Sequence, residues 1–190
     1  MNLPFICDKT FKKQTYTINP LPKAEYNNCQ FIDCEFSEAF LSYIAFTECE
    51  FINCNLSSAK VKDASFNHVI FKGCKLQGVL FQYCNPFLLA LSFENCVLNL
   101  STFNDLKLKK TLFNSCMLKQ TDFSNTDLSY STFLKCNLEQ ASFYNANLSY
   151  TDFTTSQNIT LNPEFSNLKS ARFSSENVLG LLKCYKLIIE

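Results

Sequence analysis

The chain of 190 residues has no tryptophan, only three glycines and a single histidine, His68. One histidine leaves no evident base beside the cysteines and serines, and three scattered glycines build no phosphate-binding loop. Lysine plus arginine and aspartate plus glutamate both number 17, so no net field draws the protein to nucleic acid or to an anionic membrane. We therefore expect no enzyme activity, no cofactor or metal, and no direct nucleic-acid binding.

Long apolar segments are also missing. No stretch has the length of a membrane span, and the first residues, MNLPFICDKTFKKQ, lack the apolar run of a signal peptide. A chain of this length is expected to form one domain. These features predict a cytoplasmic protein without membrane contact.

A five-residue repeat organises most of the chain. From Phe93 to Phe153, Phe and Leu alternate at every fifth position, and a mostly small residue stands two positions before each of them. The other three positions are largely polar. This period differs from the helical period of about 3.6 and the strand period of about two. A fixed repeat of this regularity indicates a solenoid.

A longer interval of twenty residues shows how the repeats are grouped. It separates Cys34, Cys54 and Cys74, and again Cys96, Cys116 and Cys136. Four five-residue segments would therefore complete one coil, with Phe in two opposite columns of the interior and Leu in the other two. Coils joined by backbone hydrogen bonds lie ~4.8 Å apart, so residues 26–173 would form a rod of about seven coils, roughly 35 Å long.

Units such as ASFYN at 141–145 and ANLSY at 146–150 resemble the pentapeptide-repeat family, whose usual motif is A(D/N)LXX. The resemblance covers about residues 24–173. It implies an all-β fold, a right-handed quadrilateral β-helix, and the handedness comes from the resemblance rather than from the spacing. The motif says little about function, because the repeated residues are used for the core.

The N-terminal segment, residues 1–23, departs from the repeat. It places Lys9 and Gln14 at positions that elsewhere hold small inward residues. Such side chains do not enter a narrow apolar interior unpaired. We expect an irregular segment or strand that caps the first coil and covers its open edge.

The C-terminal segment, residues 174–190, also changes character. Ser174 or Ser175 can begin a short helix that closes the last coil. The helix would keep an apolar face, and the tail resembles the segment through which the quinolone-resistance members of the family dimerise. A tail-to-tail homodimer is therefore predicted. The candidate interface is Val178, Leu179, Leu181, Leu182, Leu187 and Ile188.

The repeat slips by two residues within residues 82–91, because the run that ends at Phe81 resumes at Phe93. A protruding turn is expected there, and Asn85, Pro86 and Phe87 are its candidate contact residues. The alternative is a tolerated insertion without function. Longer loops, which the quinolone-resistance relatives carry, are absent from this sequence.

Most of the eleven cysteines occupy the small inward position of a repeat. Free cysteine is a small, frequently buried residue that suits this position. Zinc sites need short Cys spacings or His partners, which this sequence does not offer. Core packing is the favoured interpretation, and disulfides or a metal are the alternatives.

Two sets of outward residues are candidate partner surfaces. Between Ala24 and Ala59 acids occur without Lys or Arg, which favours a basic partner, although a charge run is more often a solvated face. Tyr130 and Tyr150 should stack above Lys110; tyrosine is enriched at interfaces but also common on β surfaces. The candidate residues are Asp33, Glu35, Glu38, Glu48, Glu50, Tyr130 and Tyr150.

These features predict a non-enzymatic, rigid rod that binds another protein, whose identity the sequence does not give. One alternative is implied by the resemblance: binding of a type II DNA topoisomerase (gyrase or topoisomerase IV) by DNA mimicry, with quinolone protection. Duplex DNA carries one charge per about 1.7 Å of axis, and a neutral chain does not match that density. A purely structural scaffold is the second alternative.

Overall fold

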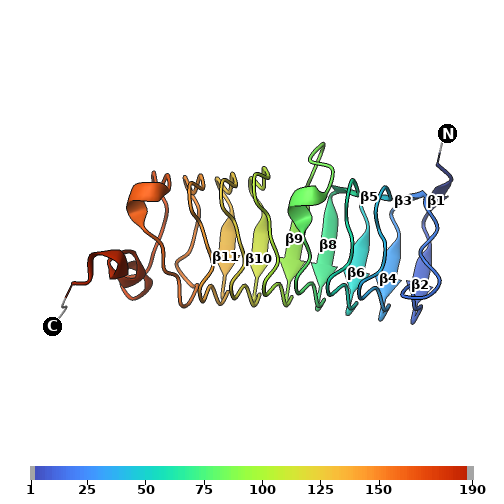
Figure 1. Ribbon diagram of the computed structural model, residues 1–190, viewed down its shortest axis with the longest axis horizontal. Coiled ribbons are helices and arrows are strands. Elements are labelled where there is room, and N and C mark those ends of the chain that lie inside the picture. The colour runs from blue at the N-terminus through green and yellow to red at the C-terminus, as the bar shows by residue number, and fades with distance from the viewer. Residues whose placement is uncertain (1–2, 188–190) are drawn as a thin grey trace.

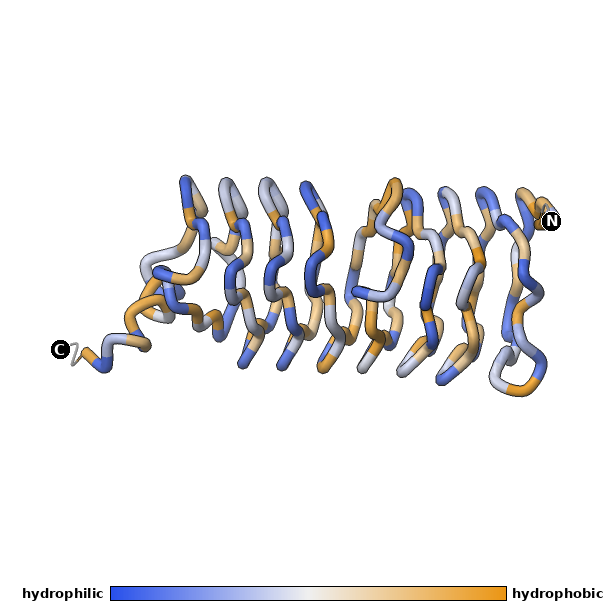
Figure 2. Tube along the Cα trace, turned by 45° about the horizontal axis from the view of Figure 1, so that its top comes forward, coloured by the Kyte–Doolittle hydropathy of each residue, from blue (hydrophilic) through white to orange (hydrophobic). Residues whose placement is uncertain are grey.

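Parallel coils stacked along one axis give the protein the shape of a rod, with the chain ends at opposite ends of it (Figure 1). The computed structural model describes residues 3–187. Within this range the regular elements are short strands and 3-10 turns, without an α-helix. The predicted all-β fold, a right-handed quadrilateral β-helix, is confirmed. Hydrophilic and hydrophobic residues alternate along each coil, so every coil contributes residues to both the core and the surface (Figure 2).

Two parallel sheets cover neighbouring sides of the rod. Side 1 carries a four-stranded sheet of β1 (Phe5–Cys7), β3 (Glu25–Asn27), β5 (Ala45–Thr47) and β7 (Ser65–Asn67). Side 2 carries a seven-stranded sheet of β2 (Thr10–Lys12), β4 (Gln30–Ile32), β6 (Glu50–Ile52), β8 (Val69–Lys72), β9 (Leu91–Glu94), β10 (Leu112–Asn114) and β11 (Thr132–Leu134). On sides 3 and 4 isolated bridges such as Glu35↔Asn55 and Phe40↔Lys60 join the coils.

Each corner of a coil is made by a residue in the left-handed conformation. Asp33, for example, has φ 53°, and its N–H donates to the carbonyl of Ile52 in the next coil at 2.9 Å. This conformation favours Gly, Asn and Asp, which explains the polar corners of the repeat. At Gly73, φ 63°, a Cβ would lie only 2.4 Å from Oδ1 of Asn53. The corners thus set both the turn and the residue types that can make it.

Aromatic rings fill the interior in continuous columns. Phe113 is fully buried and stacks on Phe93 and Phe133, with ring centroids 5.1 and 4.7 Å away. It also meets Phe103 and Phe123 edge to face, at 6.2 and 5.7 Å. Both arrangements are favourable for aromatic rings. From Phe93 to Phe133 each inward Phe therefore joins the preceding coil, the following coil and the opposite side of the rod.

Many of the small inward residues also donate hydrogen bonds to the backbone. Six cysteines form a buried cysteine ladder between sides 2 and 3, and each thiol donates to the carbonyl of a large inward residue in the preceding coil, as Cys136 does to Phe113 at 3.3 Å. Ser156 makes the same bond to Phe133 with its hydroxyl, at 2.7 Å. A buried carbonyl needs such a donor. The cysteine ladder consists of Cys34, Cys54, Cys74, Cys96, Cys116 and Cys136.

Asp and Asn at the position before the large residue have a second task. Oδ1 of Asp127 accepts the N–H of Ser129 at 3.1 Å, and Oδ1 of Asn147 accepts the N–H of Ser149 at 3.2 Å. These local bonds satisfy backbone donors in coils where side 1 has isolated bridges in place of strands. They give a physical reason for the D/N position of the motif.

The two ends of the rod differ. At the N-terminal end, residues 5–16 form a coil in register with the next one, and Lys9 and Gln14 are exposed at its open rim. At the C-terminal end the capping helix takes the form of two 3-10 turns, η3 (Asn177–Leu181) and η4 (Lys183–Tyr185). The side-chain amide of Asn177 donates to the carbonyl of Phe153 at 2.6 Å, which closes the last coil.

Between residues 82 and 91 the pairing changes by two residues. Coils are otherwise offset by twenty, whereas Val69 pairs with Leu91 and Phe71 with Phe93. A 3-10 turn, η1 (Phe81–Tyr83), precedes Pro86, and the chain then protrudes before it enters β9 (Figure 1). The sheet on side 2 continues through this point. On side 1, bridges run from Ser65 to Asn85 and start again at Lys107, with none between these two.

Candidate functional surfaces

The candidate acidic residues do not gather on one side. Asp33, Glu38 and Glu48 are exposed at three different corners. Glu50 lies on side 2, where it is paired with Lys72 at 2.7 Å, and Glu35 lies on side 3. The hydrogen bond from Lys72 holds the pKa of Glu50 below its usual range. The five carboxylates therefore lie along two adjacent sides, 2 and 3, and the corners that flank them, rather than on one flat side.

Tyr130 and Tyr150 stack at the corner between sides 1 and 2. Their ring centroids are 4.7 Å apart, the planes differ by 4°, and the side chains are 55% and 41% exposed. Both occupy the left-handed position, with φ 63° and 61°. Lys110 takes the same position one coil earlier, with φ 60°. The three residues form a strip that is cationic at one end and aromatic at the other.

The protruding turn exposes two large apolar side chains. Phe87 is 73% and Leu88 61% exposed, and Asn85 fixes the turn by accepting the N–H of Phe87 at 2.9 Å. Leu88 adopts φ 54°, a conformation that favours Asn or Gly over an aliphatic residue. Of the candidate loop residues, Asn85 remains bridged to Ser65, whereas Phe87 is largely exposed.

A hollow of about 370 Å³ opens beside this turn, at the corner that carries the tyrosines. Its apolar lining includes Ile70, Leu89, Ala90 and Leu91. Lys109, Lys110 and His68 also line it, and no carboxylate does. The sequence predicted a turn here, but the hollow depends on which extra residues bend outward, and spacing alone does not determine that.

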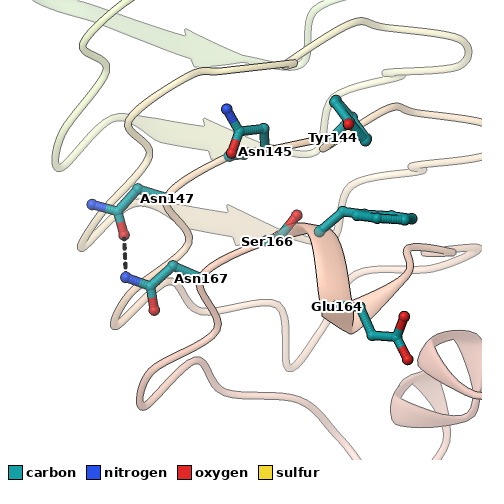
Figure 3. A pocket seen from close by; sticks show the side chains of 8 residues that line it. Tyr144, Asn145, Asn147, Glu164, Ser166 and Asn167 are labelled. Carbon is teal, nitrogen blue, oxygen red and sulfur yellow. Dashed lines mark hydrogen bonds between the residues drawn. The ribbon is translucent and has the colours of Figure 1, made fainter.

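A larger cavity, about 460 Å³, lies near the C-terminal end between residues 144–147 and 164–167 (Figure 3). Tyr144 and Phe165 flank it, with ring centroids 5.3 Å apart. Its amides are engaged in the ladder, since Asn167 donates to Asn147 at 3.3 Å. Glu164 accepts a bond from the hydroxyl of Tyr185 at 3.3 Å. Few polar groups are left free to define a ligand.

The C-terminal cap presents apolar residues at the end of the rod. Val178, Leu179 and Leu187 are exposed at 38%, 44% and 58%. Leu181 packs partly against the core, and Leu182 is half-buried. Ile188, the remaining candidate interface residue, lies outside the described residues.

The acids, cysteines and histidine of residues 3–187 are not grouped as metal ligands. No group of three or more His, Cys, Asp or Glu side chains there is placed to hold a metal ion. Burial raises the pKa of the Cys49 thiol to about 11 and that of Cys84 to about 12. Such thiols stay protonated near neutral pH and are poor nucleophiles. Among the helical turns of the same range, none is long and apolar enough to cross a membrane.

Solved structures with the same fold span nearly the whole chain. Two trypsin-treated forms of QnrB1, a plasmid-mediated fluoroquinolone resistance protein, align with TM-scores of 0.64 and 0.65 at 17% and 18% identity. The alignments cover 98% and 97% of this chain and 100% and 99% of those chains. HetL, involved in heterocyst differentiation regulation in Nostoc sp. strain PCC 7120, aligns at 0.51 and 14% identity, covering 90% of this chain and 88% of HetL. At these identities the likeness concerns the fold.

A search of curated protein sequences gave no significant match. The model of the pentapeptide repeat region matches residues 44–115 and 88–162, which together make up more than half of the chain. This match agrees with the five-residue columns, the polar corners and the coil offset of twenty described above. The chain therefore belongs to the pentapeptide-repeat family.

Proposed function

We propose that this protein is a non-enzymatic rod that binds another protein through fixed outward side chains. The observation that carries the proposal is the exposed stack of Tyr130 and Tyr150. Neither ring contributes to the core, and both occupy corners whose conformation favours other residues. Large aromatic side chains held in place lose little entropy on binding, which suits a protein interface. The continuous core supports binding without a change of shape.

The proposal is tested by photo-crosslinking in the cells that express the protein. A benzophenone amino acid is placed at Tyr150 and, as a control on side 3, at exposed Met117. We expect one discrete protein to be crosslinked from Tyr150 and not from Met117. Absence of a specific crosslink from Tyr150, or equal crosslinking from both positions, would refute this surface as the binding surface.

A stability measurement separates a functional stack from a structural one. On another corner Asn145 donates to Asn125 at 2.9 Å, so an Asn pair is a fully compatible occupant of stacked corners. We expect the double change Tyr130→Asn and Tyr150→Asn to keep or raise the melting temperature and to abolish co-purification of the partner that the benzophenone at Tyr150 identifies. A lower melting temperature would mean that the tyrosines are retained for stability.

We further propose that two rods associate through the C-terminal cap. Val178, Leu179 and Leu187 supply the exposed apolar area, and a two-fold arrangement would cover it on both copies. Leu179→Asp should then give a monomer by light scattering, with the melting of the rod retained. A wild type that is monomeric at micromolar concentration would exclude the dimer.

Topoisomerase binding is the less favoured candidate. It is motivated by the shared fold with a fluoroquinolone resistance protein. DNA mimicry needs a dense negative surface, whereas the acids here are spread over several corners and Lys72, Lys109 and Lys119 neutralise neighbouring carboxylates. A supercoiling assay with gyrase and a quinolone discriminates: protection at micromolar protein would put this candidate first.

A further inference from the structure

The apolar hollow beside Ala90 has the composition of a binding site rather than of a packing defect. Its volume of about 370 Å³ lies at the lower end of the ~300–1,000 Å³ found for ligand sites, so it takes one or two side chains rather than a large cofactor. Ile70 and Leu89 line the hollow and are only partly buried, so they expose apolar area there. Filling it would therefore remove apolar area from water.

Two lysines line the hollow, and no carboxylate does. Lys110 makes no ion pair within residues 3–187, and Lys109, paired with Asp127 at 3.2 Å, is still 58% exposed. His68 lies on the opposite rim, with Nδ1 2.7 Å from Oδ1 of Asn67. An unpaired lysine, Lys110, beside an apolar floor matches a group that combines an apolar body with a carboxylate.

The backbone around the hollow favours an extended occupant. On side 1 the bridges between coils stop at Asn85 and start again at Lys107. The coil that contains Asn85 is therefore not bridged to the next coil on this side. An added strand can use such free backbone groups. Phe87 and Leu88 stand at the edge of the same gap and extend the apolar area.

We propose that the hollow binds an extended, acidic segment of a partner protein, with one large apolar side chain in the hollow and its carboxylates beside Lys109 and Lys110. This inference rests on the proposed function and names the chemistry of the partner.

The test uses methyl-labelled protein and two capped hexapeptides of sequence EEFLEE and KKFLKK. We expect the acidic peptide to shift the methyl signals of Ile70 and Leu89 saturably, at high micromolar to millimolar concentration, and the basic peptide to leave them unchanged. Lys110→Glu should weaken binding about tenfold. Lys135→Glu is the matched control, because Lys135 occupies a left-handed corner, φ 51°, away from the hollow.

A second variant guards against indirect effects. Ala90→Phe places a ring in the hollow while the Ala90 N–H keeps its bond to the Phe66 carbonyl, and it should abolish the shifts without lowering the melting temperature. If Ala90→Phe lowers the melting temperature, the test rests on the comparison of Lys110→Glu, which should weaken binding, with Lys135→Glu, which should not. No shift with the acidic peptide, equal shifts with both peptides, or binding of sodium decanoate but of neither peptide would each overturn the proposal. The titration needs no natural partner, so its failure is distinguishable from failure of the crosslinking.

Discussion

Removing one ring from the interior tests the packing of the whole rod. Phe123 is fully buried and stacks on Phe103 and Phe143, with ring centroids 5.2 and 5.3 Å away. It also meets Phe113 and Phe133 edge to face at 5.7 and 5.8 Å. Phe123→Ala removes four ring contacts at once and leaves a cavity that neighbours bound to both adjacent coils cannot close.

The expected loss follows from these contacts. Burial of one Phe contributes about 1.5–3 kcal/mol, and truncation to Ala typically costs about 3–5 kcal/mol once the cavity is included. For a chain of this size each kcal/mol lowers the melting temperature by about 2–4 °C, so a fall of roughly 6–20 °C is expected. Phe123→Leu should cost less, because Leu41 and Val61 fill equivalent positions on side 4.

Thermal unfolding followed by circular dichroism gives the first measurement, and amide exchange gives the second. Neighbouring coils stabilise one another in a solenoid, so exchange should rise most in the coils next to Phe123 and least in β3 and β5. Lys107→Ala, an exposed control next to the inward residue Leu108, should change little. An unchanged melting temperature for Phe123→Ala would refute the packing argument.

Three further predictions concern other parts of the rod. Burial raises the pKa of Asp127, but hydrogen bonds from Ser129 and Lys109 outweigh burial, so the net pKa lies below its ordinary value. The stability that this carboxylate contributes is therefore present above about pH 4 and is lost as the pH falls. Asp127→Asn should give a melting temperature that depends less steeply on acid pH. Cys96→Ser should cost less than Cys96→Ala, measured by urea unfolding, because a hydroxyl keeps the bond to the carbonyl. Gly180→Ala places a Cβ 1.9 Å from the Ile159 carbonyl and should detach the cap, seen as faster proteolysis near the C-terminus.

The interior could be predicted from the sequence because the repeat tolerates few residue types there. A buried column with a fixed spacing accepts only large apolar and small residues, and Phe93 through Phe153 follow that rule without exception. The hydrogen bonds of the cysteine ladder were missed. The signal was present, since Ser156 and Thr126 share the small position and carry the same kind of donor, but Ala39 at that position has none.

The surfaces were less predictable, because the repeat places no condition on outward side chains. The stack of Tyr130 and Tyr150 follows directly from the offset of twenty. The hollow does not, because it depends on where the two additional residues of the 82–91 segment bend outward, and spacing alone does not determine that. The C-terminal cap likewise uses 3-10 turns, since Gly180 must lie directly on the carbonyl of Ile159.

The division between core and surface also indicates where function is to be sought. Stability in this rod comes from repeated contacts, and an outward residue that breaks the local preference lowers stability unless it gains a contact of its own. His68, Ala90, Lys110, Tyr130 and Tyr150 follow one another coil by coil along a single corner, and the last three adopt φ values near 60°. Asn and Gly would be better accommodated at those corners. We propose that a partner contacts this corner; Leu100 and Gln120, with φ 62° and 55° at another corner, show that the conformation alone does not mark a binding surface.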